Sequence, residues 1–296
     1  MNDDRRMIRP IFIIPLICFA FYGAAPAQAA APAPLARAAA DKVVPHRAVY
    51  DIDMIETRSG AQVVDVHGKM FYEWGGDCEA WTTNHRFNLV YEYADSPGMR
   101  VGSDFSTYEL RDGSGFHFSS RRSRDGELYQ ELRGHADRTQ AVYTSPEGLH
   151  FDLPDGLLFP TAHTLEMVGR FNQGTGFFSA AVFDGSDEDG PIEINTFMGP
   201  EVNPMKTVTP SDALDMSLLN TPARRVHMAV FPLGSDDPES DYEMSMVFHE
   251  NGVISDMKID YDRFSVRQSL VGIEKTQDIP CGVTPAKAAP KEKPKP

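Results

Sequence analysis

Apolar and polar residues alternate over most of this chain, which is the pattern of β-strands with one buried face. Turn residues separate the alternating runs, and no rhythm of strands alternating with helices is present. We therefore expect ten or more antiparallel strands. The runs cover residues 46–54, 63–74, 78–93, 103–111, 115–123, 127–136, 141–145, 148–153, 177–183, 192–198, 205–209, 223–231, 241–250 and 253–266.

Two dipeptides predict tight hairpins between consecutive runs. Asp125-Gly126 joins the run ending at residue 123 to the one beginning at 127, and both residues tolerate the positive φ of a type I′ turn. Asn251-Gly252 joins residues 241–250 to residues 253–266 in the same way. Both dipeptides lie between runs of high β-propensity.

One segment has the spacing of an amphipathic helix, and it lies in the middle of the chain. After Pro160, Thr161 is placed to be the N-cap, and Gly174 is placed to end the helix. Leu165, Met167, Val168 and Phe171 then form its apolar face. A second, brief helical turn is expected from Ser211 through Leu219.

Together these elements predict a mainly β protein: a single large, curved antiparallel sheet, either a β-spiral or an open barrel, with one main helix. Three arginines, an apolar run over residues 11–22 and Ala27-Gln28-Ala29 predict a secretory signal peptide over residues 1–29, with cleavage after Ala29 or alternatively Ala31. We expect a flexible Ala/Pro leader over 30–44, the β-domain over 45–283, and a disordered Lys/Pro tail over 284–296. No transmembrane segment is expected after cleavage.

The net charge of −15 is concentrated between the leader and the basic tail. So acidic a surface repels nucleic acid and anionic lipid headgroups, and no basic stripe interrupts it. We therefore exclude nucleic acid as a partner.

Cleavage of the signal peptide removes one of the three cysteines. Cys18 lies inside the apolar run of the signal, with Ile17 where a lipidated cysteine needs a small residue, so the mature chain keeps Cys78 and Cys281. An oxidising compartment favours their pairing, and free or intermolecular thiols are the alternative.

Candidate chemistry is sparse, and we expect no enzyme activity, no metal and no cofactor. The acidic loops at 184–190 and 235–243 lack calcium-loop spacing. His163 is expected to orient the start of the helix by bonding a backbone carbonyl. His163, Glu166 and Asp184 are the polar residues that we consider the best candidates for a functional role. No nucleophile elbow, phosphate loop or dinucleotide fingerprint occurs.

Several segments in fixed order resemble a known family. They are HRAVYDI, WGGDCEAW followed by HRF, LPDGLLFPTAHT, VFDG and NGVISDMKIDYDRF, and a terminal cysteine follows them. This combination is similar to the alphaproteobacterial cell-envelope integrity proteins called EipB, long classed as a domain of unknown function. The resemblance covers Pro45 to Cys281. It implies a periplasmic protein with a spiral-like antiparallel fold and a Cys78–Cys281 disulfide, and it supplies no catalytic residues.

The sequence thus favours a soluble periplasmic, non-enzymatic scaffold that supports envelope integrity under stress by binding a periplasmic protein. The alternative is a carrier that holds lipid or lipoprotein acyl chains on an apolar concave face. The 18 phenylalanines and 13 methionines suit a filled concavity and an open one equally, so the sequence leaves both functions in place.

Overall fold

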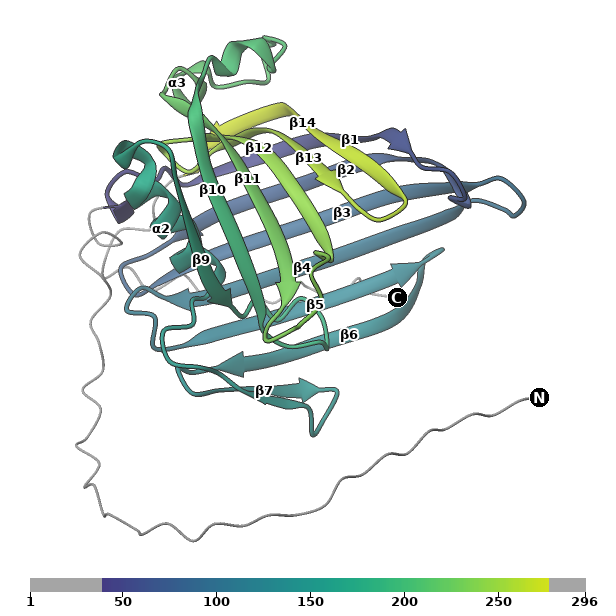
Figure 1. Cartoon of the computed structure of the whole chain (residues 1–296), viewed down its shortest axis with the longest axis horizontal. Helices are drawn as coiled ribbons and strands as arrows, with labels where there is room; N and C mark the ends of the chain where they lie inside the picture. Colours follow the sequence, from purple (N-terminus) through teal and green to yellow (C-terminus); the bar gives the residue numbers. More distant parts are fainter. Residues whose placement is uncertain (1–38, 277–296) are drawn as a thin grey trace, which may run out of the picture. The chain divides into compact units, whose positions relative to one another are not determined.

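The computed structural model describes residues 39–276, which form one antiparallel sheet of fourteen strands with a single main helix (Figure 1). This is the mainly β architecture predicted from the alternation. The strands are β1 (His46–Thr57), β2 (Val63–Gly76), β3 (Ala80–Tyr93), β4 (Met99–Leu110), β5 (Phe116–Arg124), β6 (Glu127–Ala136), β7 (Gln140–Ser145), β8 (His150–Asp152), β9 (Gly176–Val182), β10 (Ile192–Val202), β11 (Ala223–Pro232), β12 (Tyr242–His249), β13 (Ile254–Asp260) and β14 (Phe264–Lys275).

The order of the strands shows how the sheet curls. It runs β8-β7-β6-β5-β4-β3-β2-β1-β14-β13-β12-β11-β10-β9, so the first and last strands pair at its centre. Strands β8 and β9 form its two ends. Leu158 extends the β9 end as an isolated parallel bridge, with its N–H 2.9 Å from the Ala181 carbonyl oxygen. The sheet is therefore curved but not closed by a strand pair.

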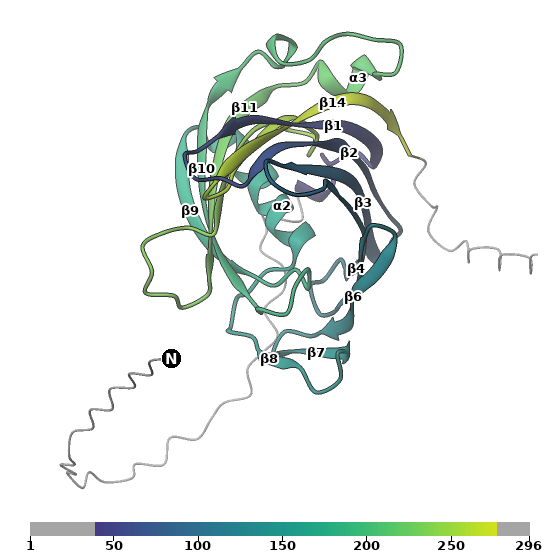
Figure 2. The same cartoon turned by 90° about the vertical axis from the view of Figure 1, so that its right-hand side faces the viewer.

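Helix α2 (Pro160–Arg170) connects the two halves of the chain and lies against the concave face, within the curve of the sheet (Figure 2). All four residues of its predicted apolar face are buried. The 3₁₀ helix η1 (Phe171–Gln173) continues it to Gly174, whose φ of 91° is available to glycine at little cost. Thr161 is not the N-cap: Pro160 already has helical geometry, so the cap is Phe159, and the N–H of Thr161 is bonded by another strand.

Both predicted hairpins form. Asp125 and Gly126 have φ of 50° and 88°, as a type I′ turn requires. At Asn251-Gly252 only the glycine has a positive φ, and the buried Asn251 side chain donates to the Leu218 carbonyl. The β12–β13 pair forms as expected.

Three predicted elements differ from the structure. Residues 205–209 are not a strand, because Pro204 has no N–H to donate and the Asn203 side chain accepts from Met205 N, which gives the 3₁₀ helix η2 (Pro204–Lys206). Residues 253–266 are not continuous, because a turn after Asp260 separates β13 from β14. The short helix α3 (Met216–Leu219) is capped by Asp215 and not by Ser211.

The segment over 30–44, predicted to be a flexible leader, is packed at its C-terminal end. Ala39 and Val43 are buried in the same cluster as Trp74, and Val44 N donates to the Asn251 carbonyl. The signal peptide, the Lys/Pro tail and Cys281 lie outside the described residues.

Candidate functional site

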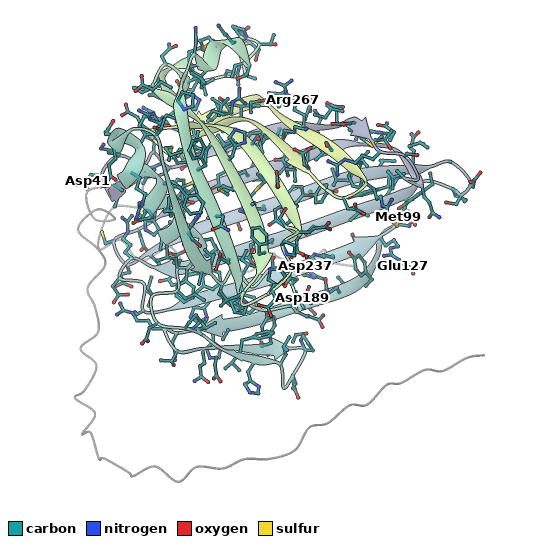
Figure 3. The ribbon with its side chains drawn as sticks, in the orientation of Figure 1. Asp41, Met99, Glu127, Asp189, Asp237 and Arg267 are labelled. Carbon is teal, nitrogen blue, oxygen red and sulfur yellow. The ribbon has the colours of Figure 1, made fainter. Side chains whose placement is uncertain are left out.

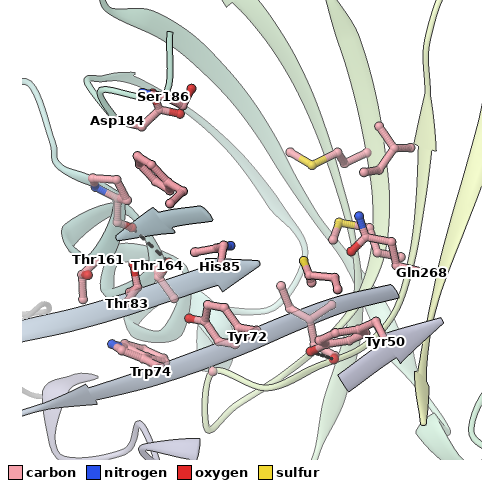
Figure 4. Close-up of a pocket in the computed structure, with 18 of the residues that line it drawn as sticks. Tyr50, Tyr72, Trp74, Thr83, His85, Thr161, Thr164, Asp184, Ser186 and Gln268 are labelled. Carbon is pink, nitrogen blue, oxygen red and sulfur yellow. Dashed lines mark hydrogen bonds between the residues drawn. The ribbon is translucent and has the colours of Figure 1, made fainter. Parts of the chain in front are cut away.

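A cavity of about 440 Å³ lies between α2 and the concave face of the sheet (Figure 4). Its volume falls within the range of small-molecule sites. Strands from both halves of the chain form its walls, because the β1–β14 pairing brings them together. The concave face is therefore not completely filled by its phenylalanines and methionines.

Most of the wall is apolar. The apolar side chains come from β2, β3, β4, β12, β13 and α2, and methionines make a large part of the surface. These residues are Met70, Phe87, Phe105, Met167, Met244, Phe248, Ile254, Met257 and Ile259. Methionine side chains are flexible and adapt to an apolar ligand without demanding a fixed shape.

Polar groups gather on one part of the wall, where β2, β3 and β4 pair. Tyr72 is the register partner of His85, and Thr83 is the partner of Thr107. Their side chains point inward because each strand alternates between its two faces. In Figure 4 Tyr72, Thr83 and His85 lie together, away from Tyr50 and Gln268.

The cavity is close to neutral. Burial lowers the pKa of His85 to about 4, so this imidazole is uncharged at neutral pH, and burial also lowers the pKa of His46. Burial raises the pKa of Tyr72 and of Tyr50, which keeps both phenols protonated. Among the described residues, no lysine or arginine lines the cavity, and Asp184 is its one carboxylate.

Two buried ionisable side chains hold α2 in place at opposite ends. From β4, Glu109 accepts from the N–H groups of Thr161 (2.7 Å) and Ala162 (2.8 Å) at the start of the helix. From β11, Arg224 donates to the Phe171 carbonyl oxygen (2.9 Å), where the helix ends. An acid at the N-terminus and a base at the C-terminus both complement the helix dipole. The sheet therefore fixes the helix that closes one side of the cavity.

The polar residues singled out in the sequence occupy separate environments. His163 is buried, its pKa is lowered to about 4, and its Nε2 lies 3.5 Å from the Thr196 hydroxyl oxygen, not on a backbone carbonyl as predicted. Glu166 pairs with Arg170 one helical turn away. Asp184 lines the cavity, where its carboxylate also accepts from Ser186 N.

Both acidic loops are built on local side-chain turns. Asp184 and Asp187 each accept from a backbone N–H two residues later in the first loop, and Asp237 does so in the second. Asp189 and Asp237, one from each loop, are labelled in Figure 3. Carboxylates that accept such bonds form Asx turns, which are common without a metal ion.

One group of possible metal ligands in the described residues was not predicted from the sequence. Ligand atoms of Asp65, His67 and Glu92 lie within 4.8 Å of one another, and His67 Nδ1 is 2.9 Å from an Asp65 oxygen. An aspartate and a histidine two positions apart on a strand share one face, which is the signal that could have identified them. They lie on the outer face of the sheet, away from the cavity, because the intervening Val66 is buried in the core.

Cys78 lies in the turn between β2 and β3, and its predicted partner Cys281 is outside the described residues. Their pairing stays a prediction. Within residues 39–276 no helix has both the length and the apolar character needed to cross a bilayer.

The sequence of this chain is similar to a known protein family and to a relative in another organism. The family model described as EipB-like matches residues 37–277. The cell envelope integrity protein EipB of Brucella abortus (strain 2308) is 29% identical over 246 residues, which cover 80% of this chain and 86% of the relative.

The fold is also similar to that of a solved structure. The crystal structure of a β-barrel-like protein of a domain of unknown function, also from Brucella abortus, matches with a TM-score of 0.71 and 28% identity. The match covers 80% of this chain and 99% of the other. The family model spans most of the sequence and all of the described sheet, so the chain belongs to the EipB-like family.

Proposed function

We propose that this protein is a periplasmic, non-enzymatic binding protein that supports cell-envelope integrity by holding an apolar chain in the cavity under α2. The cavity is the observation that carries this proposal, because its volume and its wall of methionine, isoleucine and phenylalanine suit an acyl or alkyl chain. Of the two functions that the sequence left in place, the geometry supports the carrier.

The expected affinity follows from the apolar wall. Each methylene group moved from water into such a site contributes roughly 0.8 kcal/mol. A chain of ten carbons therefore gains up to about 8 kcal/mol before the costs of association, which places its Kd in the micromolar range or weaker. An affinity in this range suits a protein that must release its ligand as well as bind it.

Intrinsic fluorescence offers a direct test. The chain has two tryptophans: Trp74 lines the cavity, and the ring of Trp81 lies 5.7 Å from that of Trp74. A bromine-labelled acyl chain bound in the cavity should quench this fluorescence. The substitution Ile254→Phe, which adds bulk to the wall, should weaken the quenching.

The control is Val64→Phe, which adds the same kind of bulk at a position that is 47% exposed. Loss of quenching in both variants, or in neither, would contradict binding in the cavity. The periplasmic location is tested separately by fractionation, in which the mature protein should be recovered in the periplasm with its N-terminus near Ala30.

A second candidate function is the binding of a protein partner, and one observation favours it. Phe177 on the end strand β9 and Phe197 on β10 are register partners, and they are 64% and 45% exposed. Adjacent exposed aromatic side chains at the end of a sheet form an apolar surface beside unpaired strand backbone, and a protein partner can cover both. Replacement of both by serine should abolish cross-linking to a periplasmic protein, whereas Leu128→Ser, at a position that is 50% exposed, should not.

A further inference from the structure

The polar part of the cavity wall can bind the polar group of a ligand whose apolar chain occupies the rest of the cavity. Tyr72 and His85 face each other across β2 and β3 with ring centroids 4.8 Å apart, in an edge-to-face arrangement. Both line the cavity, and neither has a hydrogen-bond partner within the described part of the chain. Both side chains are half-buried and reach the cavity, so their polar atoms are available to a ligand there.

The neighbouring threonines add capacity to the same place. The hydroxyl oxygens of Thr83 and Thr107 are 2.6 Å apart, so they share one hydrogen bond. Two hydroxyl groups joined by one hydrogen bond keep one undonated proton and several lone pairs for another partner. The wall can therefore both donate to a ligand and accept from it.

The polar part of the wall has no charged side chain to pair with an ionised ligand group, so such a group is excluded from this position. A buried carboxylate or phosphate is normally paired with a cation, and no lysine or arginine lines the described cavity. The two lining histidines, His46 and His85, are kept neutral by burial and supply no positive charge. Asp184 lies apart from Tyr72 and Thr83 in Figure 4, so it is not placed to neutralise a cationic group bound between them.

We propose that the cavity selects amphiphiles whose polar group, bound between Tyr72, His85 and the Thr83–Thr107 pair, is uncharged and both donates and accepts hydrogen bonds, such as a hydroxyl or a carboxamide. The inference rests on the proposed function, since the apolar chain must occupy the rest of the cavity. It adds the class of head group that the protein accepts.

Three ligands with the same ten-carbon chain test the selection: decan-1-ol, decanoate and decyltrimethylammonium. Binding to the mature protein at pH 7.5 is measured through the tryptophan fluorescence or by displacement of the brominated chain. We expect decan-1-ol to bind about tenfold more tightly than either ion, because burying an unpaired charge costs more than burying a paired hydroxyl.

The variant Tyr72→Phe removes only the hydroxyl and should weaken decan-1-ol binding about three- to tenfold. Tyr50→Phe is the matched control. Tyr50 also lines the cavity, but its hydroxyl already donates to the Ile254 carbonyl oxygen at 2.8 Å. Decan-1-ol binding should be unchanged in this control, and thermal melts verify that both variants remain folded.

The outcomes separate the two levels of the proposal. If all three ligands bind equally, or if either ion binds more tightly than the alcohol, the head-group selection is wrong while an apolar site remains. If Tyr72→Phe binds decan-1-ol as wild type does, the polar position is wrong. If none of the ligands binds, the proposed function fails, and the selection fails with it.

Discussion

Replacing Glu109 by glutamine tests how the sheet holds α2. Glu109 is 2% exposed, and its two oxygens accept from Thr161 N and Ala162 N. Burial raises the pKa of this carboxyl from 4.5 to about 7, against the opposing effect of those hydrogen bonds. Glutamine keeps the size of the side chain and an acceptor oxygen but does not titrate.

The pKa shift sets the sign and size of a pH effect. Between the unfolded pKa of 4.5 and the folded value, the folded protein holds a proton that the unfolded chain has released, so the stability due to this group falls as pH rises. Integrating the two titrations from pH 5 to pH 8 gives a loss of about 2.5 kcal/mol for wild type. The Glu109→Gln variant has no such loss, because its amide does not titrate.

The assay is thermal unfolding of both proteins at pH 5 and pH 8. The difference between the Tm of wild type and that of Glu109→Gln should shift against wild type by roughly 5–10 °C on going to pH 8, since about 1 kcal/mol corresponds to roughly 2–4 °C in a domain of this size. A constant difference, or one that moves in favour of wild type, would mean that Glu109 is ionised throughout and that the helix dipole outweighs burial.

Three further predictions concern stability and activity. Arg224→Met removes donors to the Phe171 and Gly199 carbonyls and should lower the free energy of unfolding by roughly 2–4 kcal/mol in denaturant titrations. The control is Glu201→Gln, which should cost little because this side chain is 70% exposed. Equal effects of the two substitutions would contradict the role of the carbonyl bonds. The double change Cys78→Ser and Cys281→Ser should cost on the order of 2–5 kcal/mol and match wild type under reductant, and two free thiols found by mass labelling of wild type would refute the predicted disulfide. Single substitution at each of the three polar candidates should leave envelope function intact in a complementation assay, and complete loss with the fold preserved at any one of them would indicate catalysis. These candidates are His163, Glu166 and Asp184.

The fold was predictable because its signals are local. Alternation along a strand and the Asp125-Gly126 dipeptide act within a few residues, so β5 and β6 could be identified with their turn. The predictions were wrong where contacts with distant parts of the chain determine the local structure. Thr161 has a good N-cap side chain, but Glu109, more than fifty positions earlier, already bonds the N-terminus of the helix, and so the cap was misplaced.

The candidate site depends on distant parts of the chain in the same way. Tyr72 and His85 meet because β2 and β3 pair in one register, and a shift of one residue would turn one of them to the outer face. Neither residue differs in sequence from an ordinary half-buried aromatic or histidine. What makes them a site is the space beside them, which lies between the sheet and the helix that Glu109 and Arg224 bond at its two ends. The helix could be predicted from its own periodicity, whereas the cavity that it closes requires the β1–β14 pairing of the two ends of the domain.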